Sequence, residues 1–99
     1  MFKVIHIKQM DRTNPQHVYC GRPSLLGNPY PMKGESSRDD VCNAYAIHFN
    51  TLLINDAAFR KEVERVRRLH DAGDVSLVCF CAPRRCHCET LANYLNEEL

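Results

Sequence analysis

The sequence predicts a small α/β domain that spans residues 1–99, with elements in the order β-β-α-α-β-α. Short apolar runs of strand type lie near the N-terminus and again at residues 75–81. Two segments of helical period separate these runs, and a third segment of that kind ends the chain. Because 99 residues cannot fill a second hydrophobic core, we expect one domain in which helices pack on a sheet, in either three layers or two.

The first two strands are predicted close to the N-terminus. Residues 2–7 are β-branched and roughly alternating, and residues 17–20 form a second, shorter run of the same type. The turn between them is predicted at residues 11–15, where an Asn-Pro step disfavours helix. Residues 21–35 hold three of the four glycines and three of the five prolines, so they predict an irregular loop.

Two helices should follow this loop. Helical spacing over residues 38–54 predicts the first, preceded by Ser37 and Asp40 in the pattern of a capping box. The apolar positions that carry this spacing are Val41, Tyr45, His48/Phe49 and Leu52. Asp56 has the position of a new N-cap, and Gly73 is the expected C-terminal stop of the second helix.

The third strand is predicted at residues 75–81, the most apolar stretch of the chain. Its residues are apolar on both faces, which is typical of a central strand covered by helices on both sides. From Glu89 onward, the spacing of Leu91, Leu95 and Leu99 predicts a closing helix.

Composition excludes several functional classes. A net charge of +1 excludes a uniformly basic nucleic-acid binder, although residues 1–34 carry five basic residues against one acidic residue. No apolar run approaches the roughly 18 residues of a membrane span, and the N-terminus is too polar for a signal peptide. We therefore expect a cytoplasmic protein with no membrane partner and with its six cysteines reduced.

Four of the six cysteines crowd between Cys79 and Cys88, where the third strand leads into the closing helix. Open α/β sheets bind ligands at this edge. One interpretation is a reactive thiolate on Cys86 or Cys81, with His87 as its acid-base partner and with nearby arginines and a helix N-terminus lowering its pKa. A second is zinc held by Cys79 or Cys81 together with Cys86, His87 or Cys88. In a third, the cysteines are small buried core residues.

Residues 21–30 form the second segment with possible chemistry. Arg22 and Ser24 offer a guanidinium and a hydroxyl to an anion, on a loop whose glycines let backbone amides face a ligand. The lysine of a phosphate-binding P-loop is absent. Alternatively, the loop is structural and packs Leu25, Leu26 and Tyr30 into the core.

Other candidates carry weaker signals. Cys20 and Cys42 are expected to be buried thiols, and His48 a core histidine on an apolar helix face. The helix face from Arg60 to Arg68 has five basic residues in nine positions, so it is either a solvated surface or a contact for a nucleic-acid backbone.

Taken together, these segments resemble the bacterial and phage family called domain of unknown function 4326. The resemblance rests on G-R-x-S-x-L-G-N-P-Y at residues 21–30, Ser37-Arg38 opening a helix, and C-x-C-A-P-x-x-C-H at residues 79–87. The family pattern continues with Gly and Asp, where this chain has Cys88 and Glu89. The resemblance implies a compact α/β fold and a phage or mobile-element setting, and it implies no established reaction.

From these observations we expect a phage or prophage protein that binds a nucleotide or another anionic small molecule where the two loops meet. The candidate catalytic residues are Cys86, His87 and Cys81. The candidate ligand-binding residues are Arg22, Ser24, Asn28 and Arg84. No cofactor or metal ligand is assigned. The alternative is a non-catalytic module that binds a host protein or nucleic acid, with a structural or zinc-binding cysteine cluster. Convergence of the loops on a concave pocket would favour an enzyme.

Overall fold

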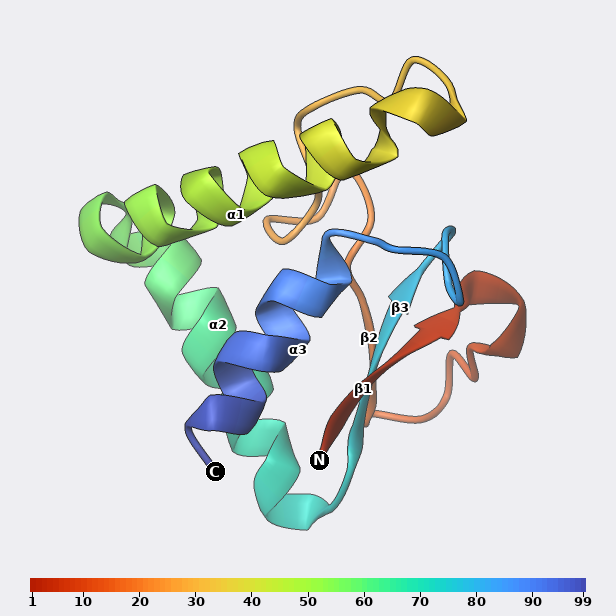
Figure 1. Ribbon diagram of the computed structural model, residues 1–99. Helices are drawn as coiled ribbons and strands as arrows, with labels where there is room; N and C mark the ends of the chain where they lie inside the picture. The colour runs from red at the N-terminus through yellow and green to blue at the C-terminus, as the bar shows by residue number, and fades with distance from the viewer.

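The computed structural model describes residues 1–99. The chain forms one sheet of three parallel strands (Figure 1). The strands are β1 (Phe2–His6), β2 (His17–Tyr19) and β3 (Val75–Cys79). Their order in the sheet is β1-β3-β2, so the last strand of the chain is the central one. All five residues of β3 are buried, as their apolar character predicts.

Three helices complete the predicted order and share one side of the sheet (Figure 1). They are α1 (Arg38–Asn55), α2 (Ala57–Leu69) and α3 (Cys88–Glu97). Short 3₁₀ turns occupy Ile7–Gln9, Glu35–Ser37 and His70–Ala72. None of the helices combines the length and the hydropathy needed to cross a bilayer.

The hydrophobic core lies between the helices and one face of the sheet. Alternate residues of β3, namely Val75, Leu77 and Cys79, enter a single cluster of 17 buried residues to which all three helices contribute. Of the two arrangements, the structure has two layers, and the expectation that helices cover both faces of the central strand is wrong. Val78 on the opposite face is still fully buried. Its register partners Ile5 and Tyr19 are half-buried there, so the flanking strands shield this face without a second helical layer.

The predicted element boundaries are partly confirmed. Asp56 caps α2, since its side chain accepts a hydrogen bond of 3.1 Å from the Phe59 N–H. Gly73 has φ +135°, which explains why the chain turns there. The capping box at Ser37 is wrong, because its hydroxyl instead accepts from the Lys33 N–H and donates to the Gly34 carbonyl, both at 2.9 Å.

A side chain of α3 fastens the last helix to the first strand. The Asn96 carboxamide accepts a hydrogen bond from the Phe2 N–H at 2.8 Å and donates one to the Phe2 carbonyl at 2.9 Å. It thus replaces the neighbouring strand that β1 lacks at this edge of the sheet.

We expect Asn96→Ala to lower the free energy of unfolding by about 1–3 kcal/mol, because both backbone groups of Phe2 lose their partner. Denaturant unfolding measures the change. Asn50→Ala is the matched control, since Asn50 is exposed on α1. Both substitutions gain similar helix propensity, so the control should be neutral or slightly stabilising. Equal effects of the two substitutions would contradict a fastening role for Asn96.

Candidate functional site

A pocket of about 190 Å³ opens beside the carboxyl end of β3, at the edge predicted from the sequence. Two loops converge on it, the loop after β2 and the loop between β3 and α3, and α1 closes a third side. Three arginines and no carboxylate line it. The lining residues are Gly21, Arg22, Asn28, Tyr30, Met32, Arg38, Val41, Cys42, Phe80, Cys81, Arg85, Cys86 and His87.

Backbone contacts give the loop after β2 its shape. The Cys20 N–H extends the sheet by one hydrogen bond of 2.9 Å to the Val78 carbonyl, and consecutive turns follow. Gly27 packs against the backbone of Arg22, where an added Cβ would lie only 3.0 Å from the Arg22 nitrogen. The buried Tyr45 of α1 donates a hydrogen bond of 2.9 Å to the Leu26 carbonyl and anchors the far end of the loop.

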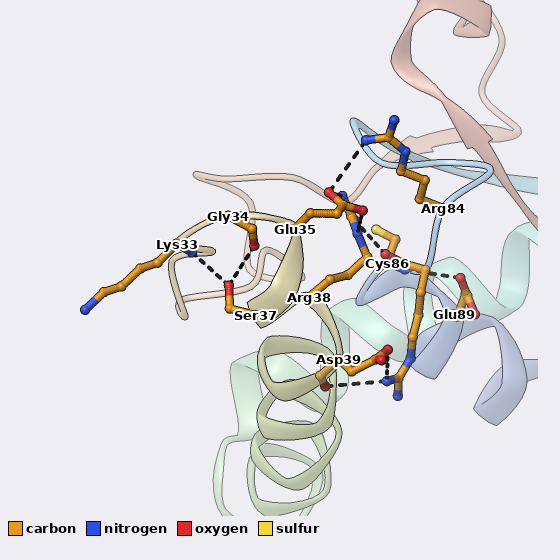
Figure 2. A network of polar contacts seen from close by, with 10 residues as sticks. Lys33, Gly34, Glu35, Ser37, Arg38, Asp39, Arg84, Cys86 and Glu89 are labelled. Carbon is orange, nitrogen blue, oxygen red and sulfur yellow. Dashed lines mark hydrogen bonds and ion pairs between the residues drawn. The ribbon is translucent and has the colours of Figure 1, made fainter.

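The N-terminus of α1 is held against the β3–α3 loop by two arginines (Figure 2). The Arg38 guanidinium makes two hydrogen bonds to the Glu35 carboxylate and a third, of 2.9 Å, to the Arg85 carbonyl. Arg85 in turn donates to the Asp39 carboxylate at 2.9 Å and to the Asn43 side chain at 2.8 Å. The hydrogen bonds to the Glu35 carboxylate raise the pKa of Arg38 most, and the Cys81 thiol raises it further.

Two predicted ligand-binding residues lie outside the pocket lining. Arg84 points away toward Glu35, with 3.6 Å between its guanidinium and the carboxylate (Figure 2). The Ser24 hydroxyl is buried in its own loop without a hydrogen-bond partner.

The other two predicted ligand-binding residues, Arg22 and Asn28, do line the pocket. Asn28 is engaged within the chain, since its carboxamide accepts from the Tyr30 N–H at 2.9 Å and donates to the Val41 carbonyl at 3.5 Å. Arg22 is exposed, and its guanidinium makes no hydrogen bond or ion pair within the chain. Arg22 is therefore the free cation of the pocket.

His87 is held in one orientation beneath the pocket. Its Nε2 lies 2.7 Å from the Cys20 carbonyl, which can only accept, so this nitrogen carries the proton. Nδ1 is then the nitrogen with the free lone pair, and it lies 3.5 Å from the Cys86 sulfur. Burial lowers the pKa of His87, and the ring packs edge-on against Tyr45. The neutral imidazole is thus placed as a proton acceptor.

The expected thiolate on Cys86 does not fit the electrostatics of this loop. Hydrogen bonding with Cys79 raises the pKa of Cys86, whereas the thiols of Cys86 and Cys88 lower that of Cys79. The Cys86 N–H is also occupied by the Glu89 carboxylate at 3.1 Å, which offsets the positive end of α3 (Figure 2). The prediction of a lowered pKa at Cys86 is wrong, because hydrogen bonding with the Cys79 thiol and burial both raise the pKa of Cys86.

Cys81 occupies a different environment from Cys79, although a strand over residues 75–81 would place these two residues, two positions apart, on one face. β3 ends at Cys79, so alternation stops there. Cys79 is buried in the core, and the half-buried Cys81 lines the pocket beside Arg38. No disulfide joins any of the six cysteines.

The family described as Domain of unknown function (DUF4326) matches residues 5–97. The chain belongs to this family. No curated protein and no solved structure matches it. Within this DUF4326 chain, the residues at 21–30 and 79–87 that carried the resemblance supply most of the pocket wall.

Several residues of the pocket wall of this DUF4326 domain are absent from the candidate residues named from the sequence, among them Arg38, Arg85 and Cys42. Arg38 was part of the Ser37-Arg38 pattern, so the family resemblance held a signal for it. Arg85 is adjacent to the predicted Arg84, and only the path of the loop decides which of the two faces the pocket. Cys42 was expected to be a buried thiol, and it is both buried and a part of the pocket wall.

The lowered pKa of His87 predicts a specific acid sensitivity. Below the ordinary pKa of 6.5 the unfolded chain binds a proton that folded His87 does not, so stability falls as the pH drops from 6.5 toward the folded-state value. His87→Gln keeps a donor for the Cys20 carbonyl and should flatten this part of the stability profile. Unfolding measured between pH 7.5 and about 5 in the presence of a chelator tests this prediction. Asn50→Ala is the control, because this exposed residue of α1 does not titrate.

Proposed function

We propose that this domain binds an anionic small molecule, a nucleotide or another phosphorylated compound, in the pocket between the two loops. One observation carries the proposal: three guanidinium groups and no carboxylate line the pocket. Arginine presents forked donors that match phosphate and carboxylate oxygens. The pocket therefore combines positive charge with the donor geometry that an anion requires.

Arg22 is the residue that would contact the anion. The charges of Arg38 and Arg85 are offset by Glu35 and Asp39, and most of their donors are already used. Arg22 keeps all its side-chain donors free at the mouth of the pocket. The two paired arginines shape the wall and add positive potential, while Arg22 provides the direct hydrogen bonds.

The rim of the pocket favours a ligand that also carries a ring. Tyr30 and Phe80 line it and remain 40% and 62% exposed. Exposed aromatic faces stack on bases without sequence preference. The volume of about 190 Å³ is below the roughly 300–1,000 Å³ of pockets that enclose a drug-sized ligand. It therefore suits one anionic group and one ring, with the remainder of the ligand outside.

The proposal has an enzymatic form. In it, Cys81 is the nucleophile, because it is the half-buried thiol on the pocket wall, and His87, which lines the same pocket, is the residue that would exchange a proton. Cys86 is the less accessible candidate for attack, with only 3% of its surface exposed. The phage or prophage setting and the cytoplasmic location expected from the sequence belong to this proposal as well.

The competing proposal is an interaction module that meets a host protein or nucleic acid through the α2 face from Arg60 to Arg68. This face has less support, because Glu62 and Glu64 pair with Arg65, Arg67 and Arg68 along the helix. These carboxylates neutralise much of the charge that would attract a phosphate backbone. The convergence of the two loops favours the ligand pocket.

Arg22→Ala should weaken the binding of AMP, ADP or inorganic phosphate by about 1.5–3 kcal/mol, which is the value of a hydrogen bond to a charged group. Isothermal titration calorimetry measures the affinity. Arg12→Ala is the control, since Arg12 is also exposed but lies outside the pocket. Equal affinity of the two variants, or no binding of any of the three probes by the parent protein, would reject the pocket as an anion site.

Cys81 should react with iodoacetamide before the other cysteines of the folded protein, because it is the half-buried one and the other five are buried. Mass-spectrometric mapping of labelling against time provides the measurement. Saturating AMP should slow labelling at Cys81 if the ligand covers the pocket. If Cys81 labels no faster than Cys42, which also lines the pocket, the reactive-thiol form of the proposal fails.

A further inference from the structure

Three cysteine sulfurs meet inside the protein behind the pocket. Cys79 ends β3, and Cys86 and Cys88 lie at the start of α3. Their sulfur atoms all lie within 4.8 Å of one another, and all three residues are buried. The cluster thus brings together Cys79 and Cys86, which are separated in the chain by the six residues 80–85.

The surroundings of this cluster favour a cation. Arg84 and Arg85, the arginines next to Cys86 in the chain, pair with carboxylates near the start of α1 and not with the sulfurs. A fourth thiol, that of Cys20, contacts Cys88. Thiols are weak hydrogen-bond donors and gain little from contact with each other, whereas thiolates are strong ligands for soft metal ions.

We propose that Cys79, Cys86 and Cys88 bind a zinc ion as three thiolate ligands, with the Cys20 thiol as a further donor. Tetrahedral zinc has Zn–S bonds of about 2.3 Å, which place two ligand sulfurs about 3.8 Å apart. The cluster therefore needs to contract by only about 1 Å to reach this geometry. Each thiol that enters as SH releases its proton to solvent as its sulfur takes up the metal.

The backbone already holds the ligands in place. Cys79 is fixed in β3 opposite His6 of β1. The Glu89 N–H donates to the Cys86 carbonyl at 3.0 Å, and the Glu89 carboxylate accepts from the Cys86 N–H at 3.1 Å. This reciprocal pair sets the turn that carries both Cys86 and Cys88. A bound ion would therefore tie the central strand to α3 and hold both ends of the loop that forms the pocket wall.

This inference does not depend on the anion pocket. Zinc binding involves buried sulfurs and is measured with the metal alone, whereas anion binding is assigned to Arg22 on the surface. Arg22→Ala should therefore lose anion affinity and keep zinc. A failure of one proposal leaves the other unaffected.

The test uses the full chain, reduced and freed of metal by a chelator. Titration with Zn²⁺ should show one high-affinity site per chain, with dissociation constant well below 1 μM (about −8.2 kcal/mol). Co²⁺ in place of Zn²⁺ should give the intense absorption of tetrahedral thiolate coordination. Bound Zn²⁺ should also protect Cys79, Cys86 and Cys88 from alkylation, while Cys81 remains reactive.

Cys88→Ala removes one ligand without adding a buried hydroxyl, and Cys42→Ala is the matched control, because Cys42 is buried outside the cluster. Loss of a group that only orients a metal ligand weakens metal binding by roughly 10–100-fold. Cys88→Ala removes a ligand itself, so it should weaken zinc binding by more than this. Cys42→Ala should bind zinc like the parent protein. Circular dichroism reports whether each variant folds.

Two results would overturn the proposal. One is a folded, reduced parent protein that takes up no Zn²⁺ or shows no thiolate band with Co²⁺. The other is a folded Cys88→Ala variant that binds zinc as tightly as Cys42→Ala. The first result is measured on the parent protein alone, so it can still overturn the proposal if the Cys88→Ala variant does not fold.

Discussion

The site depends on the burial of β3 between two parallel partners. Each edge of this strand is paired, to β1 on one side and β2 on the other, and one face packs on the helices. Because all three strands run in the same direction, the loops that leave β2 and β3 emerge at one edge of the sheet. Residues 20–30 and 80–87 are therefore neighbours, although about fifty residues separate them in the chain.

The third wall of the pocket is held by contacts that are individually weak. Exposed ion pairs such as Arg85 with Asp39 contribute about 0–1 kcal/mol each. Arg38 is different, because its side chain is only 12% exposed and also binds the Arg85 carbonyl. Together with the buried hydrogen bond from Tyr45 to the Leu26 carbonyl, it fixes the start of α1 relative to both loops. The contact between Arg38 and the Arg85 carbonyl therefore fixes where these two arginines lie in the pocket wall.

The thiols divide into two environments within ten residues of sequence. Cys81 lines the pocket, whereas the sulfurs of Cys79, Cys86 and Cys88 meet in the core, and Cys86 also forms part of the pocket wall. The end of β3 at Cys79 causes this division, since the chain leaves the sheet there and strand alternation no longer applies to Cys81. The same short loop thus has one surface suited to a ligand and another suited to a metal ion.

By itself, the sequence determined the order of the elements, the central place of β3 and the two loops that meet. The hydrophobic period, the N-cap at Asp56 and the turn at Gly73 are local signals that mark where the elements lie. Parallel strands then bring their carboxyl ends to one edge of the sheet. Only the tertiary structure decided that the helices cover one face and that Arg85, not Arg84, lines the pocket. It also decided that a carboxylate and a second thiol surround Cys86. These features depend on the direction of individual side chains after long-range packing, which residue type and spacing do not specify.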